Sequence, residues 1–290
     1  MGITDLPHKV LKKYRNEGFV PLLKYGKLFF RGHSRKYFED LIAKRILWGD
    51  SQFHAYTQWW HYIHQKRFIA PADPFRTIVV NPQKVGVYNT VIGKKWGLSR
   101  IVGGKWDQEI HRKQLTRNWI FKGLKQRFVE GLEWEKTDYF KTAEREFQHG
   151  KLLWGYENLD QFLKIRCGYV DDLYESIRQN GYRPNRISKH ENPCADIRSK
   201  ETVYIHQLEP LVVIGRDGTI YWSDGYHRAT IAQIIGLQQL PVQILCRHKG
   251  WQQVRDAIAR AEAPEVLTGE LKNYLDHPDL IDVVPKSWQI

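Results

Sequence analysis

The fold is decided by residues 211–236, which read LVVIGRDGTIYWSDGYHRATIAQIIG. Two β-rich runs, Leu211–Ile214 and Thr219–Trp222, flank an Asp-Gly pair, and this pattern predicts a β-hairpin. The apolar residues that follow recur at helical spacing and end at Gly236. They predict a helix over His227–Ile235 that is closed by a glycine C-cap. A further strand is predicted over Leu240–Cys246. After the first strand of the hairpin, the chain is therefore predicted to form a strand–turn–helix–strand unit.

The turn before the predicted helix has the composition of an anion-binding site. Ser223 and Asp224 are residue types that cap helix N-termini, and Gly225 lets a ligand approach the backbone closely. Free N–H donors and the helix dipole favour a phosphate at such a position, where Arg228 adds a bidentate grip and His227 a further donor. We therefore expect a nucleotide phosphate to be bound by Ser223, Gly225, Tyr226, His227 and Arg228. The structural alternative is that Asp224 only caps the helix, with His227 and Arg228 exposed.

Two carboxylates are candidates for catalysis and for binding a magnesium ion. Asp224 suits the orientation of His227 or Arg228, a metal ion, or the proton of a substrate hydroxyl. Asp107 ends the run Gly103-Gly104-Lys105-Trp106-Asp107, in which Gly104 favours a tight loop and Trp106 is a candidate for stacking on a base or sugar. The alternative is a simple turn with Trp106 in the core. The candidate catalytic residues are Asp107, Asp224 and His227.

A third cluster follows the strand predicted over Leu240–Cys246. Arg247 and His248 come directly after it, and ligands of α/β sheets gather beyond the carboxyl ends of strands. If this strand lies beside Tyr221–Ser223, Arg247 and His248 join the phosphate site. Otherwise they form a surface cluster.

The rest of the chain is predicted to alternate between helices, a strand and a loop. The expected order is a strand over Phe75–Val80, irregular helices over 108–150, a helix over Val170–Asn180 before Gly181, a loop over 184–202 and a helix over Trp251–Glu262.

Charge and composition restrict the partners. The formal net charge of +13 implies an anionic partner, which includes nucleotides, nucleic acid and an anionic membrane surface. Residues 1–35 are basic and amphipathic, so we expect either attachment to an anionic membrane or packing on the main domain. Three cysteines without a CxxC pair argue against a disulfide framework and a thiolate zinc site. With no apolar stretch long enough to cross a bilayer, we expect a cytoplasmic protein that is peripheral on the inner membrane face if residues 1–35 bind there.

The run Val212–Ile220 and the turn Asp224–Ala229, followed by Gly236-Leu237 and Pro241-Val242, resemble the ParB/sulfiredoxin superfamily. The likeness is greater to uncharacterised prokaryotic ParB-like proteins. It extends over 170–255 and more loosely over 75–107. It implies an α+β fold with a small mixed sheet of ParB/sulfiredoxin type over 71–263 and a helical insertion at about 108–165. A basic amphipathic helical region over 1–70 and a C-terminal tail over 264–290 complete the expected organisation.

In that superfamily a Gly-X-His-Arg or Gly-X-Arg-Arg turn holds nucleotide phosphates, which implies this role for Gly225, His227 and Arg228. Tyr226 stands where sulfiredoxins carry a catalytic cysteine, so sulfinic acid reduction is not expected. The implied function is that of a nucleotide-binding enzyme. We expect ATP or another nucleoside phosphate with Mg²⁺, and phosphoryl transfer to a small hydroxyl compound or a surface-glycan intermediate. The alternatives are a ParB-like nucleic-acid-binding protein or nuclease, and a nucleotide sensor without turnover.

Overall fold

Seven strands form one mixed sheet. The computed structural model describes residues 50–93, 97–151, 153–156, 158–188 and 208–288. The expectations for residues 1–35, and most of those for 1–70 and for the loop at 184–202, therefore lie outside the described residues. The strands are β1 (Thr77–Val80), β2 (Val87–Asn89), β3 (Arg100–Val102), β4 (Arg112–Gln114), β5 (Leu211–Ile214), β6 (Ile220–Asp224) and β7 (Leu240–His248).

The sheet is arranged around β7. The strand order is β1-β7-β5-β6-β2-β4, and β3 also pairs with β7. Because β1 pairs with the first half of β7 and β3 with its last three residues, these two short strands share one edge while β5 occupies the other. The pairs β5–β7, β3–β7 and β2–β6 are parallel, and the others are antiparallel.

Helices and short helical turns make up much of the described chain outside the sheet. The α-helices are α3 (Asp50–Gln65), α4 (Trp119–Phe128), α5 (Asp138–Gln148), α6 (Leu159–Gln161), α7 (Gly168–Asn180), α8 (Asn185–Ser188), α10 (Tyr226–Ile235), α11 (Lys249–Arg260) and α12 (Gly269–Lys272). Short 3₁₀ turns are η2 (Pro82–Lys84), η4 (Glu109–His111), η5 (Leu115–Arg117), η6 (Trp134–Lys136), η9 (Pro264–Val266), η10 (Pro278–Leu280) and η11 (Lys286–Trp288), and η7 (Phe162–Cys167) is a π-helix. The protein is thus an α+β protein with a mixed sheet.

Residues 211–236 fold as predicted. β5 and β6 form an antiparallel hairpin, and α10 follows and ends at Gly236, whose φ of 79° is the left-handed conformation expected of a glycine C-cap. The strand predicted at Leu240–Cys246 is confirmed and runs two residues longer.

Three strands, β2, β3 and β4, were not predicted. β2 is three residues long, and β4 is the polar tripeptide Arg-Lys-Gln inside the segment expected to be a helical insertion. Neither shows the alternation of apolar and polar residues on which a strand prediction depends. Within the segment expected to be helical from about residue 108, the first α-helix, α4, begins at Trp119, after β4 and two 3₁₀ turns.

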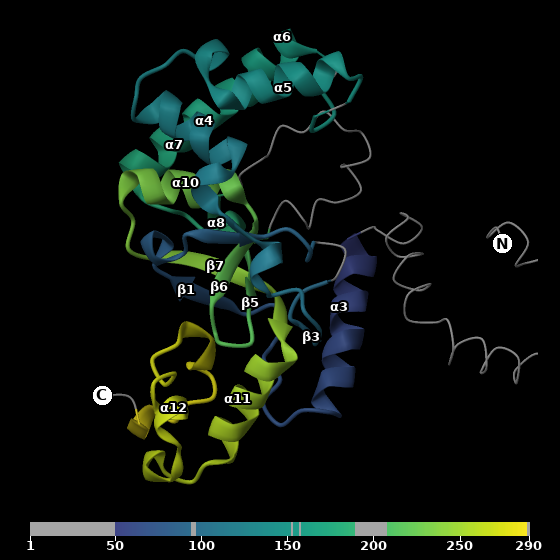
Figure 1. Cartoon of the computed structure of the whole chain (residues 1–290), viewed down its shortest axis with the longest axis vertical. Helices are drawn as coiled ribbons and strands as arrows, with labels where there is room; N and C mark the ends of the chain where they lie inside the picture. The colour runs from purple at the N-terminus through teal and green to yellow at the C-terminus, as the bar shows by residue number, and fades with distance from the viewer. Residues whose placement is uncertain (1–49, 94–96, 152, 157, 189–207, 289–290) are drawn as a thin grey trace, which may run out of the picture. The chain divides into compact units, whose positions relative to one another are not determined.

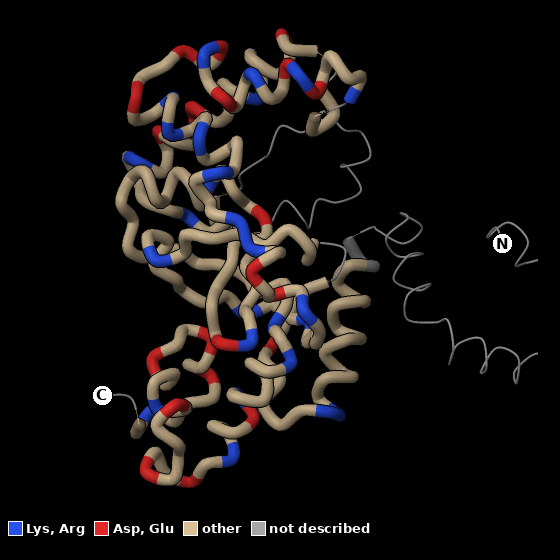
Figure 2. The backbone as a smooth tube through the Cα atoms, in the orientation of Figure 1, with Lys and Arg blue, Asp and Glu red and all other residues tan. Residues whose placement is uncertain are grey.

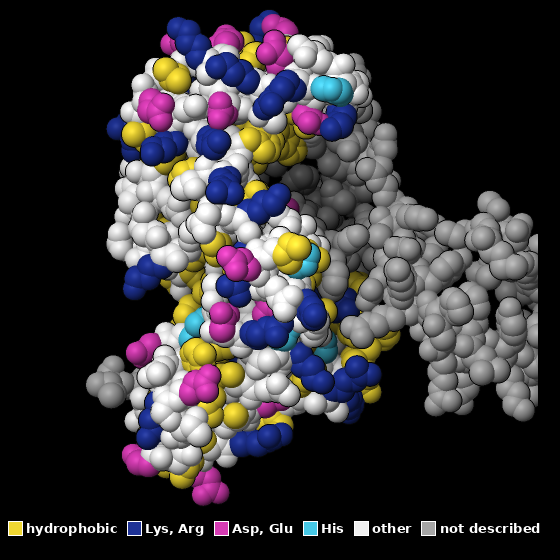
Figure 3. Space-filling model, in the orientation of Figure 1, with side chains coloured by type: hydrophobic (Ala, Val, Ile, Leu, Met, Phe, Trp, Pro, Cys, Tyr) yellow, Lys and Arg dark blue, Asp and Glu magenta, His cyan; other side chains and the backbone are white. Residues whose placement is uncertain are grey.

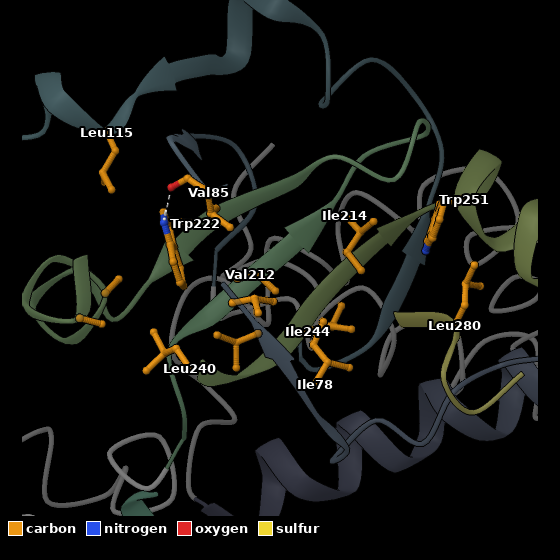
Figure 4. Close-up of a cluster of buried hydrophobic side chains, with 14 of the residues drawn as sticks. Ile78, Val85, Leu115, Val212, Ile214, Trp222, Leu240, Ile244, Trp251 and Leu280 are labelled. Atoms are coloured by element: carbon orange, nitrogen blue, oxygen red, sulfur yellow. Dashed lines mark hydrogen bonds between the residues drawn. The ribbon is translucent and has the colours of Figure 1, made fainter. Parts of the chain in front are cut away.

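Two hydrophobic cores flank α10. The sheet core gathers Val212, Ile214, Trp222 and Ile244, and Figure 4 shows the Trp222 indole donating to the carbonyl of Val85 at 2.9 Å. The second core lies among α4, α5, η7 and α7, called here the helical lobe (residues 119–180). Figure 1 shows α10 between the lobe and the sheet, in agreement with its contacts to α4 and α7.

Helix α10 has almost no solvent face at its centre. Ala229 and Ala232 belong to the sheet core, whereas Ile231 belongs to the core of the lobe. The four residues 229–232 are all fully buried. The helix whose N-terminus forms the candidate site is therefore held from two sides.

The C-terminal segment packs onto the sheet core. Leu267, Leu280 and Val284 are buried in it, and Figure 4 shows Leu280 beside Trp251 of α11. The Asp279 carboxylate, which is fully buried, accepts from the guanidinium of Arg247 at 2.6 and 2.8 Å and from the indole of Trp251 at 2.9 Å. Charged groups thus anchor this segment inside the protein.

Within the described ranges, no helix has both the length and the apolar character needed to cross a bilayer.

Candidate functional site

In the described part of the chain, helix α10 begins without a side-chain cap. Gly225 is the N-cap in the left-handed conformation, with φ 77°, and no side chain caps the helix. A side chain at Gly225 would meet the backbone, since an added Cβ would lie 2.8 Å from the Cα of Pro210. Among the described residues, no hydrogen bond occupies the amide N–H groups of residues 226–228.

The expected capping by Ser223 or Asp224 is wrong. The Ser223 hydroxyl donates to the carbonyl of Ile92 at 2.8 Å, and Asp224 Oδ1 accepts the adjacent N–H of Gly225 at 2.6 Å. Because α10 starts after a left-handed glycine, both side chains lie before the first turn and miss its amides. This leaves the first-turn donors available.

Arg228 is held by the segment before β5. Its guanidinium donates to the Tyr182 hydroxyl at 3.2 Å and to the Leu208 carbonyl at 3.0 Å, and it lies 3.8 Å from the Glu209 carboxylate. Tyr182 in turn donates to Glu209 at 2.5 Å. Arg228 therefore supplies positive charge from a fixed position, and it is not the exposed side chain of the structural alternative.

His227 lies in a network that reaches into the helical lobe. Its Nε2 is 2.9 Å from the hydroxyl of Tyr139 on α5, and that hydroxyl also accepts from Nε of Arg166 on η7 at 3.3 Å. The terminal amino group of Arg166 is 3.4 Å from each ring nitrogen of His227. Tyr139 and Arg166 are both buried, so the network is rigidly placed.

Aromatic rings surround the network. The guanidinium of Arg166 lies 4.5 Å from the ring centroid of Trp154 and 5.3 Å from that of Tyr169, within the range of cation–π contacts. The indole of Trp154 also meets the ring of His227 edge-on at 5.7 Å. Trp154 has a φ of 49°, an uncommon conformation for a residue with a side chain, and such strain concentrates at functional sites.

The local electrostatics favour an anion. Burial, and then the charges of Arg166 and Arg228, hold the pKa of His227 well below its ordinary value, so the ring is neutral at physiological pH. Burial also raises the pKa of the Tyr139 phenol and, on the other side of the turn, that of Tyr226, whose ring packs edge-on against Tyr88. Two guanidinium groups, a neutral imidazole and free amides are therefore gathered at one helix end.

The second predicted motif forms a separate cluster. Asp107 is fully buried, and its carboxylate accepts from Nε and the terminal amino group of Arg216 at 2.9 and 2.7 Å and from the Arg216 backbone at 2.9 Å. Trp106 is buried, with Nε1 donating to the Val102 carbonyl at 3.2 Å. The carbonyl of Gly104 accepts from Arg216 at 2.9 Å. This is the packed turn of the structural alternative.

The two motifs lie at opposite ends of β5. Arg216 follows the C-terminal end of β5, whereas Gly225 packs against Pro210, which precedes its first residue. Four extended residues span about 13 Å. Asp107 and Asp224 are therefore too far apart to bind the same metal ion, and the two candidate carboxylates do not form one magnesium site.

Arg247 and His248 do not join the phosphate turn. β7 pairs with β5 and not with β6, and the register places Arg247 beside Ile214 at the far end of the hairpin. Arg247 is buried against Asp279, and His248 accepts the N–H of Gly250 at 2.9 Å and thereby caps α11. The expectation depended on a strand neighbour that residue patterns do not specify.

The ion pair at Asp107 has a measurable signature. Burial alone would raise the pKa of the Asp107 carboxyl group. Hydrogen bonds from Arg216 outweigh this effect and lower the pKa from 3.8 to about 2. A lowered carboxyl pKa stabilises the fold above pH 4, and the contribution is lost as the pH falls towards 2. We expect Asp107→Asn to lower the free energy of unfolding by about 1–2 kcal/mol at pH 7, with the difference vanishing near pH 2.

Urea unfolding followed by circular dichroism at pH 7, 4, 3 and 2 measures this difference. Asp217→Asn is the matched control, because that exposed carboxylate lies 3.8 Å from Arg112 and its loss should cost little. A difference between Asp107→Asn and the wild type that stayed constant from pH 7 to pH 2 would contradict the assignment.

Tyr139, Trp154 and Arg166 were not predicted as site residues. One signal could have found Arg166: it stands on the apolar stripe made by Phe162, Val170, Leu173 and Ile177, at spacings of three and four residues. A charged residue on such a stripe is buried in the fold. Nothing in the sequence sets Tyr139 apart from the other aromatic residues of the lobe.

The described residues include no cluster of three or more His, Cys, Asp or Glu side chains arranged to hold a metal ion. Only Asp224 among the candidate metal ligands lies at the α10 turn. Mg²⁺ commonly takes one or two carboxylates and completes its coordination with phosphate oxygens and water. A single carboxylate at a turn that bound a phosphate would fit that pattern.

The fold and the candidate site define an α+β protein in which helix α10 begins beside two arginines and, within the described residues, without a side-chain cap. No family model matches the chain, and no curated protein or solved structure matches it.

Proposed function

We propose that this protein binds a nucleoside phosphate at the N-terminus of α10 and transfers a phosphoryl group from it to a hydroxyl compound. The observation that carries the proposal is the uncapped first turn of α10 beside two arginines. Helix N-termini with free amides bind phosphate in many unrelated proteins. The turn Gly225-Tyr226-His227-Arg228 and the mixed sheet behind it also support a fold of ParB/sulfiredoxin type.

Arg166 and Arg228 neutralise the phosphate charge in this proposal. Arg228 is fixed by Tyr182 and Leu208, and Arg166 by Tyr139, so neither must be ordered when the ligand binds. Preorganised charges of this kind stabilise the charge that is spread over the phosphoryl oxygens in the transition state.

The proposed reaction is a simple exchange of bonds. The acceptor oxygen forms a bond to the terminal phosphorus, the bond to the bridging oxygen breaks, and the proton of the hydroxyl group leaves to a base. Asp224 is the candidate base or magnesium ligand, since it is the predicted carboxylate nearest the turn. Bound Mg²⁺ would supply charge neutralisation to the phosphates.

The charge distribution gives less support to a nucleic-acid-binding protein or nuclease. The helical lobe and the segment that precedes it, residues 108–180, contain thirteen Lys and Arg but also twelve Asp and Glu. Figure 2 shows positive and negative residues interspersed there, and Figure 3 shows the same mixture on the surface of the lobe. Residues 1–49 hold eleven Lys and Arg against four Asp and Glu. Attachment of residues 1–35 to an anionic membrane, as a peripheral protein of the cytoplasmic face, remains part of the proposal for that segment.

Calorimetric titration of the full chain with ATP, ADP, AMP and adenosine, with and without Mg²⁺, tests the proposal. We expect affinity to fall along that series, because each lost phosphate removes contacts to amides and guanidinium groups. Arg166→Gln should weaken ATP binding at least tenfold, since a hydrogen bond to a charged group contributes about 1.5–3 kcal/mol. In a second assay, transfer or hydrolysis should fall in Asp224→Asn while ATP binding persists.

Arg178→Gln is the matched control. Arg178 lies on the exposed surface of α7, bonded to Glu175, so the same chemical change there should leave ATP affinity unchanged. Adenosine binding as tightly as ATP, or ATP not binding at all, would refute the proposal. Salt-dependent DNA binding that ignores Arg166→Gln would favour the nucleic-acid alternative.

A further inference from the structure

Among the described residues, the hydroxyl of Tyr139 has one possible acceptor. Tyr139 is fully buried, and the hydrogen-bond partners of its hydroxyl in the described ranges are Nε of Arg166, at 3.3 Å, and Nε2 of His227, at 2.9 Å. A guanidinium donates hydrogen bonds and accepts none. The phenolic hydrogen must therefore point to Nε2 of His227, because a buried hydroxyl without an acceptor is costly.

This assignment fixes the tautomer of His227. If Nε2 accepts a hydrogen bond, a neutral imidazole carries its proton on Nδ1. The amino group of Arg166 lies at the same distance, 3.4 Å, from both ring nitrogens. An amino group at the same distance from both ring nitrogens lies over the face of the imidazole ring. The position of Arg166 therefore does not single out Nδ1 as a hydrogen-bond acceptor, and Nε2 keeps that role.

We propose that Tyr139 is a positioning residue that holds His227 as a neutral Nδ1–H donor, and that this donor binds a phosphate oxygen at the N-terminus of α10. The second half of the proposal rests on the proposed function; the tautomer does not. His227 then acts as a hydrogen-bond donor and not as a base. Tyr139 serves the site from the lobe without touching the ligand.

The groups that face His227 all favour this state. Arg166 lies against the ring from η7, Arg228 adds a second positive charge from α10, and Tyr139 approaches from α5. Beyond Arg166 lies the ring of Tyr169, on α7. No carboxylate among the described residues hydrogen-bonds to the ring and so none stabilises an imidazolium there. Neutral imidazole donors beside a helix N-terminus are known in other enzymes.

Long-range ¹H–¹⁵N correlation on the full chain with labelled histidine, without ligand, reads the tautomer directly. The His227 signals are assigned by their loss in His227→Gln. We expect a protonated Nδ1 and an unprotonated Nε2 in the wild type from pH 6 to 8, and a loss of this preference in Tyr139→Phe. ATP affinity should fall about fivefold to tenfold in Tyr139→Phe, the size of one oriented hydrogen bond.

Tyr174→Phe is the matched control, because that tyrosine stacks on Phe128 in the same lobe and its hydroxyl has no hydrogen bond among the described residues. It should change neither the tautomer nor the affinity, and thermal melting checks that both variants fold. A proton on Nε2 in the wild type, or an unchanged tautomer in Tyr139→Phe, overturns the positioning role. ATP binding that is insensitive to Tyr139→Phe overturns the donor role. A wild-type chain with the expected tautomer but no affinity for ATP refutes the proposed function and the donor role, and the positioning role is still supported.

Discussion

Asp279→Asn is expected to lower the free energy of unfolding by about 3–5 kcal/mol, which is the usual cost of removing one partner of a buried ion pair. The carboxylate is fully buried between Arg247 and Arg255, and Arg247 itself is only 2% exposed. The amide of asparagine keeps the shape but leaves the guanidinium charge of Arg247 without its counter-ion and Arg255 with Asp282 alone among the described carboxylates. Urea or guanidinium chloride unfolding at pH 7 measures the loss.

Asp282→Asn is the control for this prediction. That carboxylate also bonds to Arg255, at 2.9 Å, and to Arg76, but its side chain is 31% exposed, so water can replace it. Its loss should cost about 1 kcal/mol or less. Equal costs for the two substitutions would show that burial does not set the strength of the Asp279 network.

Gly123→Ala is expected to cost about 3 kcal/mol of stability and to weaken ATP binding as well. Helix α4 approaches α5 at Gly123 so closely that an added Cβ would lie 2.2 Å from the Cβ of Tyr139 and 2.5 Å from its backbone nitrogen. Because backbone atoms cannot rotate away, the two helices must separate, and overpacking of this kind is destabilising. The separation also moves the Tyr139 hydroxyl away from His227.

Gly168→Ala provides the comparison. Gly168 begins α7 in ordinary helical conformation, and an added Cβ there meets nothing within 4 Å. Alanine should be neutral or stabilising by about 0.5–1 kcal/mol, since it reduces the freedom of the unfolded chain. If chemical unfolding gave the two alanine variants equal stabilities, the close approach of α4 and α5 would be refuted.

Local patterns predicted the elements whose residues carry their own signal. Asp217-Gly218 marked the hairpin, Gly236 marked the end of α10, and Gly181 marked the end of α7. β2 and β4 were not predicted because three residues are too few to show an alternation of apolar and polar side chains, and β4 is wholly polar. Their pairing depends on neighbouring strands and not on their own side chains.

The candidate site was predicted in part for the same reason. Gly225, His227 and Arg228 are adjacent in sequence, so a turn motif was enough to group them. Arg247 was misplaced because strand order is a property of the whole sheet, and Tyr139 and Arg166 come from a segment some 60 to 90 positions earlier. Long-range contacts of this kind leave no periodic pattern in one sequence.

The burial of α10 on two sides has a consequence for cooperativity. Successive residues of α10 belong to two different cores. Neither core can therefore lose its packing without exposing residues of the helix that both cores share. The lobe and the sheet should therefore melt together in a single all-or-none transition, although they look like separate layers. An arrangement of this kind also ties the integrity of a ligand site at the end of α10 to the integrity of the whole folded unit.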